Sequence, residues 1–150
     1  MLNPFDPKAS LLAKHAQHVV LIHFPIALYL TATFLDSLSR IFKKLPAFDA
    51  VRWNFLCAAI ASLPAAGTGI LAWRWALAGQ AFKGILRLHF LFALAAILGM
   101  WATVWVRYAR KVRHEEDGHV SILVFEWCVC LLLAVAGHLG GFLSGVNGAP

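Results

Sequence analysis

Four long apolar runs, separated by short polar stretches, account for most of the chain. They cover roughly residues 16–38, 53–75, 85–106 and 120–143. A helix rises 1.5 Å per residue, so about 20 residues cross the ~30 Å hydrocarbon core of a bilayer. The pattern predicts a single domain over residues 1–150, an all-α membrane bundle of four antiparallel helices that run up-down-up-down. We expect no internal repeat among the four runs.

The composition supports an integral membrane protein over a soluble apolar bundle. Hydrophobic residues make up 61% of the chain and charged residues 13%, whereas a soluble domain has roughly 45–50% and 25%. The net charge of +6 does not indicate a nucleic-acid partner, because the basic residues lie just outside the apolar runs, where membrane topology explains them. The expected surroundings are therefore membrane lipid.

The basic residues also predict how the bundle is oriented. One side of it carries eight of them: Arg40, Lys43, Lys44, Arg52, Arg107, Arg110, Lys111 and Arg113. The other side carries five: Lys8, Lys14, Arg74, Lys83 and Arg87. Basic loops stay in the cytoplasm, so we expect both termini outside, in the periplasm of a Gram-negative bacterium. The predicted location is the inner membrane, as a multi-pass protein.

Histidines are the polar residues that most need an explanation in these runs. Threading the chain through the bilayer places His23, His89 and His138 at similar depth near the outer face, with His18 further out. His18 and His23 are about 140° apart around one helix, so they address different neighbours. Polar groups within a membrane need partners inside the protein and are usually functional. We therefore predict a site built from His23, His89 and His138, with His18 as a secondary candidate.

The first interpretation of this site is a b-type haem, one or two per chain. Facing helices of a bundle can supply two neutral imidazoles as axial ligands. No Cys-x-x-Cys-His pattern is present for covalent attachment. Arg74 and Arg87 lie at the same face, where they could pair with the haem propionates. Small residues that follow His89 at helical spacing leave room for a flat cofactor.

Two other interpretations remain open. Imidazoles also bind copper or zinc, and His23, His89 and His138 are then the metal ligands. Alternatively, the same histidines donate hydrogen bonds to backbone carbonyls freed by prolines, with no cofactor, and the chain is a membrane anchor or scaffold subunit. Asp36 and Glu126 lie toward the other face, where we expect them to pair with a base such as Arg40 or Arg107.

Several motifs resemble the bacterial membrane family called domain of unknown function 2231. They are the run HVVLIHFPIAL at 18–28 followed by Asp36, residues 69–73, His89, and residues 137–141 with Gly145 and Val146. Together they span nearly the whole chain. The family's usual proline after the first histidine is Val19 here, which argues against a special role for His18. The acidic residue usual before Trp73 is Ala72.

The resemblance implies four membrane spans. It also implies electron transfer, because of the redox modules with which relatives are associated. Members of the family that this chain resembles look as if they occur fused to, or beside, Rieske-type iron–sulfur and cytochrome c modules. The motif histidines match positions 18, 23, 89 and 138. The resulting hypothesis is a cytochrome b-like subunit of an oxidoreductase complex. It would carry electrons between the quinone pool and a periplasmic partner such as a cytochrome c, a Rieske protein or a dehydrogenase.

Overall fold

Four helices make up the computed structural model, which describes residues 14–42, 48–75, 77–112 and 120–145. They are α2 (Lys14–Ile41), α3 (Phe48–Trp75), α4 (Gly84–Val112) and α5 (Val120–Leu143). Each contains one of the predicted apolar runs, and each is long and apolar enough to cross a membrane. The N-terminal arm, the charged stretch 113–119 and the last five residues lie outside the described residues.

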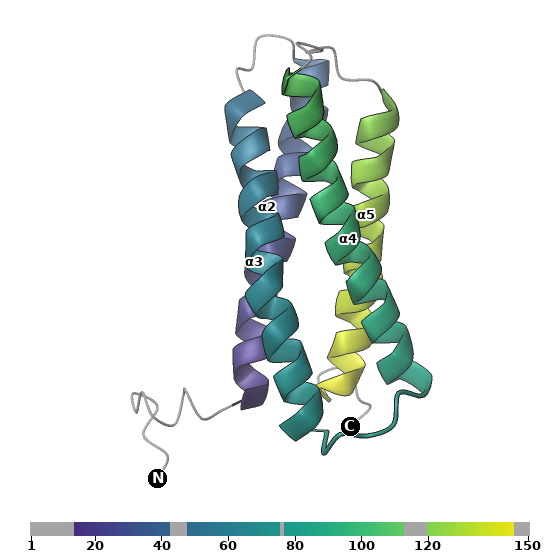
Figure 1. Ribbon diagram of the computed structural model, residues 1–150. Helices are drawn as coiled ribbons and strands as arrows, with labels where there is room; N and C mark the ends of the chain where they lie inside the picture. The colour runs from purple at the N-terminus through teal and green to yellow at the C-terminus, as the bar shows by residue number, and fades with distance from the viewer. Residues whose placement is uncertain (1–13, 43–47, 76, 113–119, 146–150) are drawn as a thin grey trace.

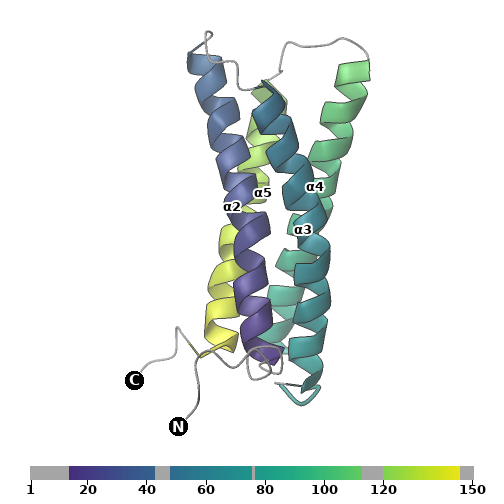
Figure 2. The same ribbon diagram turned by 90° about the vertical axis from the view of Figure 1, so that its left-hand side faces the viewer.

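The helices form an antiparallel up-down-up-down bundle (Figure 1). The start of α2 and the end of α5 lie at one end, which we call the terminal end; the end of α2 and the start of α5 lie at the distal end (Figure 2). The closest packing occurs within the hairpins α2–α3 and α4–α5, and α3–α4 and α2–α5 contacts join them. These features confirm the predicted all-α four-helix membrane bundle.

Alanines and a few larger side chains fill the centre of the bundle. Tyr29 and Phe55 are buried and meet edge-on, with ring centroids 4.9 Å apart. The Tyr29 hydroxyl hydrogen-bonds Thr103 Oγ1 at 2.8 Å, which joins α2 to α4 across the bundle. Large apolar side chains instead cover the outside; Trp105, for example, is 73% exposed. Since lipid rather than water favours such a surface, the structure is that of a multi-pass membrane protein.

The two hairpins share one packing register. Adding 71 to a buried position of the first hairpin repeatedly gives a buried position of the second. The pairs are Pro25 and Ala96, Tyr29 and Met100, Ala32 and Thr103, Ala58 and Val129, Ala59 and Cys130, and Ala65 and Ala136. This corrects the expectation of no internal repeat. Most paired positions carry different residues, so the repeat is evident in burial rather than in residue identity.

Candidate functional site

Two histidines from different hairpins line one cavity at the terminal end. His18 comes from the first turns of α2 and His89 from the first turns of α4, and both are partly buried. The cavity, which we call the histidine cavity, has a volume of about 260 Å³. Its other walls include Trp73, Phe82 and Phe90. The site is thus an apolar chamber that contains two imidazoles.

Each of these imidazoles is oriented by a backbone carbonyl of the neighbouring helix. His18 Nδ1 lies 3.0 Å from the Ala65 oxygen on α3, and His89 Nδ1 lies 2.9 Å from the Ala136 oxygen on α5. A carbonyl only accepts, so Nδ1 carries the proton in both rings and Nε2 carries the lone pair. Metal-bound histidines in proteins are usually held in this way. Both rings therefore have the tautomer that a ligand through Nε2 requires.

Glycines make room for both rings. Gly69 follows Ala65 by one helical turn, and a Cβ there would lie 3.0 Å from His18 Cε1. Gly140 follows Ala136 in the same way, and a Cβ there would lie 3.1 Å from His89 Cε1. Glycine inside a helix is destabilising by roughly 0.5–1 kcal/mol relative to alanine. Its presence at both positions is explained by the close approach of the rings.

The arrangement of histidine, carbonyl and glycine in the first hairpin recurs at equivalent positions of the second hairpin. Histidine and carbonyl are 47 residues apart in each hairpin. The 71-residue offset relates all three members: it leads from His18 to His89, from 65 to 136, and from Gly69 to Gly140. This common spacing of His, Ala and Gly is visible in the sequence, and it is the signal that identifies His18 and His89 as a pair.

His23 and His138 do not join this pair. Both are exposed on the outside of the bundle. His23 Nδ1 lies 2.6 Å from the Val19 oxygen of its own helix, and the His138 ring meets Phe142 edge-on at 5.1 Å. Among the described residues, no three His, Cys, Asp or Glu side chains form a group that could hold a metal ion. The predicted convergence of His23, His89 and His138 is therefore not found.

His23 and His138 fail to meet His89 mainly because their side chains point in other directions around their helices. His18 and His89 line one cavity and so lie at similar depth, whereas His23, five residues further along α2, lies about 7.5 Å deeper in the bundle. Residues at equal depth can also face opposite ways. His18 faces the cavity, and His23 is five residues later, so it faces outward. His138 is two residues from both Ala136 and Gly140, and it likewise faces away from His89 on α4. The weaker candidate, His18, is the residue that shares a cavity with His89.

Arg74 and Arg87 lie at the same end of the bundle as the histidine cavity. Arg74 is in the last turn of α3 and Arg87 in the first turn of α4, and both are exposed. Between them, the Trp73 indole donates to the Gln80 oxygen at 2.8 Å, and its ring contacts Phe82 at 4.5 Å. This contact holds the α3–α4 connection over the cavity.

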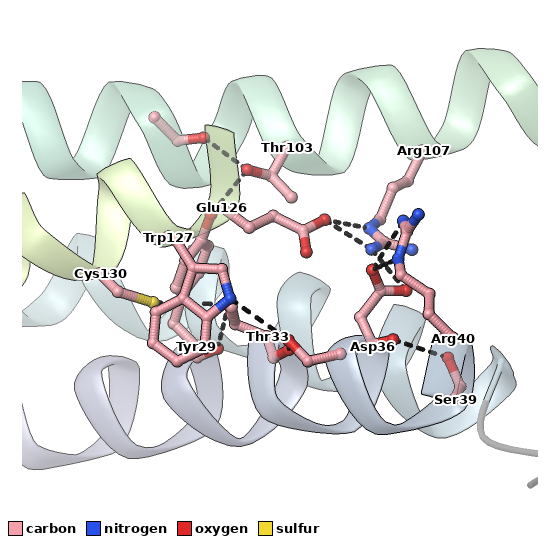
Figure 3. A network of polar contacts seen from close by, with 12 residues as sticks. Tyr29, Thr33, Asp36, Ser39, Arg40, Thr103, Arg107, Glu126, Trp127 and Cys130 are labelled. Atoms are coloured by element: carbon pink, nitrogen blue, oxygen red, sulfur yellow. Dashed lines mark hydrogen bonds and ion pairs between the residues drawn. The ribbon is translucent and has the colours of Figure 1, made fainter. Parts of the chain in front are cut away.

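A charged network occupies the distal end (Figure 3). Arg107 donates through Nε to Glu126 Oε1 at 2.9 Å, and its Nη2 lies 3.0 Å from Asp36 Oδ1. Arg40 pairs with Asp36 Oδ2 at 2.8 Å. Glu126 is fully buried, and its Oε2 has no hydrogen-bond partner among the described residues. The predicted pairing of Asp36 and Glu126 with Arg40 and Arg107 is confirmed.

Comparison with known proteins gives one match. The family described as "Predicted membrane protein (DUF2231)" matches residues 14–149, which is nearly the whole chain. No curated protein and no solved structure matches the chain. The family description states no activity, ligand or partner. By the extent of this match, and in agreement with its four apolar helices, the chain belongs to the DUF2231 family of membrane proteins.

Proposed function

We propose that the chain binds a b-type haem in the histidine cavity, where His18 and His89 would hold the iron. The observation that carries this proposal is that both imidazoles line one apolar cavity and that both have Nδ1 bonded to a backbone carbonyl. Two neutral imidazoles from facing helices are a donor set that suits b-type haem. His23 and His138, exposed on the outside, do not take this role in the proposal.

The donor set fits haem better than it fits copper or zinc. Zinc takes four protein ligands in structural sites and three plus water in catalytic ones, whereas two ligands complete the coordination of a haem iron. Among the described residues the cavity offers two histidines and no acidic or thiol side chain. The remaining walls are small, aliphatic or aromatic, such as Ala93, Leu94 and Phe90, and this apolar lining suits the faces of a macrocycle.

The size of the cavity sets a condition on haem binding. Its volume of about 260 Å³ is below the roughly 300–1,000 Å³ of ordinary ligand pockets. A macrocycle therefore requires wall side chains to move. Leu77 and Phe82, which line the cavity from the α3–α4 connection, are the ones we expect to do so.

A bound haem would supply one-electron transfer within the membrane. The chain's own residues would set the conditions for it. The Ala65 and Ala136 carbonyls fix the two rings, the aromatic walls exclude water, and Arg74 and Arg87 at the same end would balance the propionate charges. In this proposal the site lies near the outer face of the inner membrane. There a cytochrome c, Rieske protein or dehydrogenase would exchange electrons with it, and the quinone pool would be the other partner.

One observation favours a second candidate, a membrane anchor without a cofactor. The same two hydrogen bonds join α2 to α3 and α4 to α5, so they satisfy the histidines without any ligand. In that case His18 and His89 stabilise the hairpins and the cavity has no chemical role.

The absorption spectrum of the full chain, purified from haem-replete cells, decides between the two. We expect a Soret band and reduced α and β bands of b type. His18→Ala and His89→Ala should each remove most of the bound haem, whereas the matched controls His23→Ala and His138→Ala should keep it. A colourless wild-type protein would refute haem binding, and loss of haem in the controls alone would refute this choice of ligands.

A further inference from the structure

A second cavity lies at the distal end, between α3 and α4. It has a volume of about 380 Å³ and is lined by Arg52, Trp53, Trp101, Trp105 and Tyr108, together with residues deeper in the bundle. Figure 2 shows the distal half of α4 standing apart from α3. This distal cavity is at the opposite end from the histidine cavity and shares no lining residue with it.

Arg52 gives the distal cavity a positive charge that the described residues balance poorly. Its Nη1 is buried and has no hydrogen-bond partner among the described residues. The nearest carboxylate oxygen, on Asp49, is 3.9 Å away, and the Asp49 side chain is 81% exposed. A buried donor without an acceptor is unfavourable, so this geometry calls for an acceptor beyond the described residues.

The other arginine of the cavity is already paired. Arg107 contacts both Asp36 and Glu126, and Arg40 contacts Asp36. With two acids and two bases, this network is formally neutral, so it offers no spare carboxylate to Arg52, whose nearest one is that of the exposed Asp49, 3.9 Å away. An incoming group that carries a negative charge would pair with Arg52 without disturbing the network.

The remaining lining points to a lipid. Trp53, Trp105 and Tyr108 are 56%, 73% and 64% exposed, and they lie at the end of the spans, where tryptophan and tyrosine meet the headgroup region. Trp101 lies one turn deeper on α4, toward the acyl chains. The cavity thus presents a cation at headgroup level and an apolar wall below it. Basic pockets of this kind between membrane helices bind acidic lipid headgroups.

We propose that the distal cavity binds an anionic phospholipid, with its phosphate on Arg52 and an acyl chain along Trp101 and Trp105. This site is independent of haem binding. A quinone would also fill the apolar part, but it is neutral and would leave the charge of Arg52 unbalanced. A zwitterionic lipid brings its own cation to the headgroup, and that cation competes with Arg52 for the phosphate.

Native mass spectrometry of the full chain tests this site. The protein is equilibrated in detergent with equal amounts of phosphatidylglycerol and phosphatidylcholine that have identical acyl chains. We expect the wild type to retain one phosphatidylglycerol in preference by about fivefold, the factor that one Lys or Arg near a membrane surface contributes. Arg52→Gln should bring the two lipids to parity. The matched control Lys83→Gln, which removes an exposed charge at the terminal end, should keep the preference.

A second measurement does not depend on the variant folding. Phosphatidylglycerol with brominated acyl chains should quench the tryptophan fluorescence of the wild type in vesicles more strongly than brominated phosphatidylcholine at the same fraction. Equal quenching by the two lipids would overturn the proposal. So would a preference that survives Arg52→Gln, or retention of an isoprenoid quinone in place of the phospholipid.

Discussion

Positions related by the 71-residue repeat carry identical residues at the terminal end of the bundle and oppositely charged residues at the distal end. At the terminal end, equivalent positions of the two hairpins carry identical residues, His18 and His89, each beside an alanine carbonyl and a glycine. At the distal end, the equivalent positions Asp36 and Arg107 carry opposite charges and contact one another at 3.0 Å. The members of both pairs are separated by the same 71 residues.

This contrast suggests what each end contributes. Two like imidazoles cannot satisfy each other through their lone pairs, so matching groups from two hairpins suit a ligand placed between them. Opposite charges satisfy each other directly, and they fix how one hairpin sits against the other. In our proposal the distal end holds the hairpins together, and the terminal end would hold the cofactor. Substitutions at the two ends test this division of roles between the distal and terminal ends.

Breaking the charged network should have the largest effect on stability. Arg107→Met leaves the carboxylate of Glu126 buried without its partner, and such a loss typically costs about 3–5 kcal/mol. The free energy of unfolding, measured by circular dichroism as the denaturing detergent is increased, should fall by that amount. Adding Glu126→Gln to Arg107→Met removes the stranded charge, so the double variant should be more stable than the single one. A single variant within about 1 kcal/mol of the wild type would show that the distal end does not hold the hairpins together.

Filling the space beside each imidazole should affect haem binding more than stability. Gly69→Val and Gly140→Val place a side chain against the rings of His18 and His89. We expect haem content per protein, measured from the Soret absorbance, to fall at least about tenfold, which corresponds to ~1.4 kcal/mol.

Two nearby glycines provide matched controls for this substitution. A Cβ at Gly67 or at Gly137 would meet nothing within 4 Å. Gly67→Val and Gly137→Val should therefore keep the haem content of the wild type. If all four variants lose haem equally, the loss reflects helix packing in general, and the specific contact with the imidazoles is not supported.

Removing the hydrogen bond across the middle of the bundle should lower its stability moderately. Tyr29→Phe removes the bond to Thr103, whose hydroxyl still donates to the Gly99 oxygen. One such bond contributes about 1 kcal/mol to the free energy of unfolding. Tyr108→Phe is the control, because Tyr108 is exposed and its variant should match the wild type. Equal stability of the two variants would mean that the contact does not couple the hairpins.

Replacing the two arginines at the terminal end should have the smallest effect, and it should be seen in the midpoint potential of a bound haem. Removing a positive charge near a haem stabilises its oxidised form, so Arg74→Gln and Arg87→Gln should each lower the midpoint potential. Because both side chains are exposed, the shift should stay below about 40 mV, or ~1 kcal/mol for one electron. Potentiometric titration measures it, and a rise in potential would exclude a propionate-pairing role.

Much of this architecture is predictable from residue type and order. The four apolar runs locate the helices, and counting residues from the ends of the runs places His89 in the first turns of its helix, near the terminal end. The acids within the apolar runs are correctly expected to pair with Arg40 and Arg107, because an unpaired charge there is unfavourable. These inferences need only length, hydropathy and charge.

The direction in which each histidine side chain points cannot be predicted from its depth along the bundle alone. His18 ranks second in the sequence because it lies nearer the end of its apolar run than His23 does, yet backbone carbonyls and a facing glycine decide where a ring fits. Those features belong to α3 and α5, not to the helices that carry the histidines. The register between helices is set by packing, as at Gly99, where an added Cβ would lie 2.6 Å from Val129 Cγ2. Only the common spacing of His, Ala and Gly in the two hairpins signals that register in the sequence.

The near-infrared magnetic circular dichroism spectrum of the oxidised full chain is the sharpest test of a haem held by His18 and His89, since its charge-transfer band identifies the axial ligands. We expect a bis-imidazole band that is lost in His18→Ala and in His89→Ala and is unchanged in His23→Ala and His138→Ala. A bis-imidazole band that persists in His18→Ala and disappears in His23→Ala would contradict this assignment.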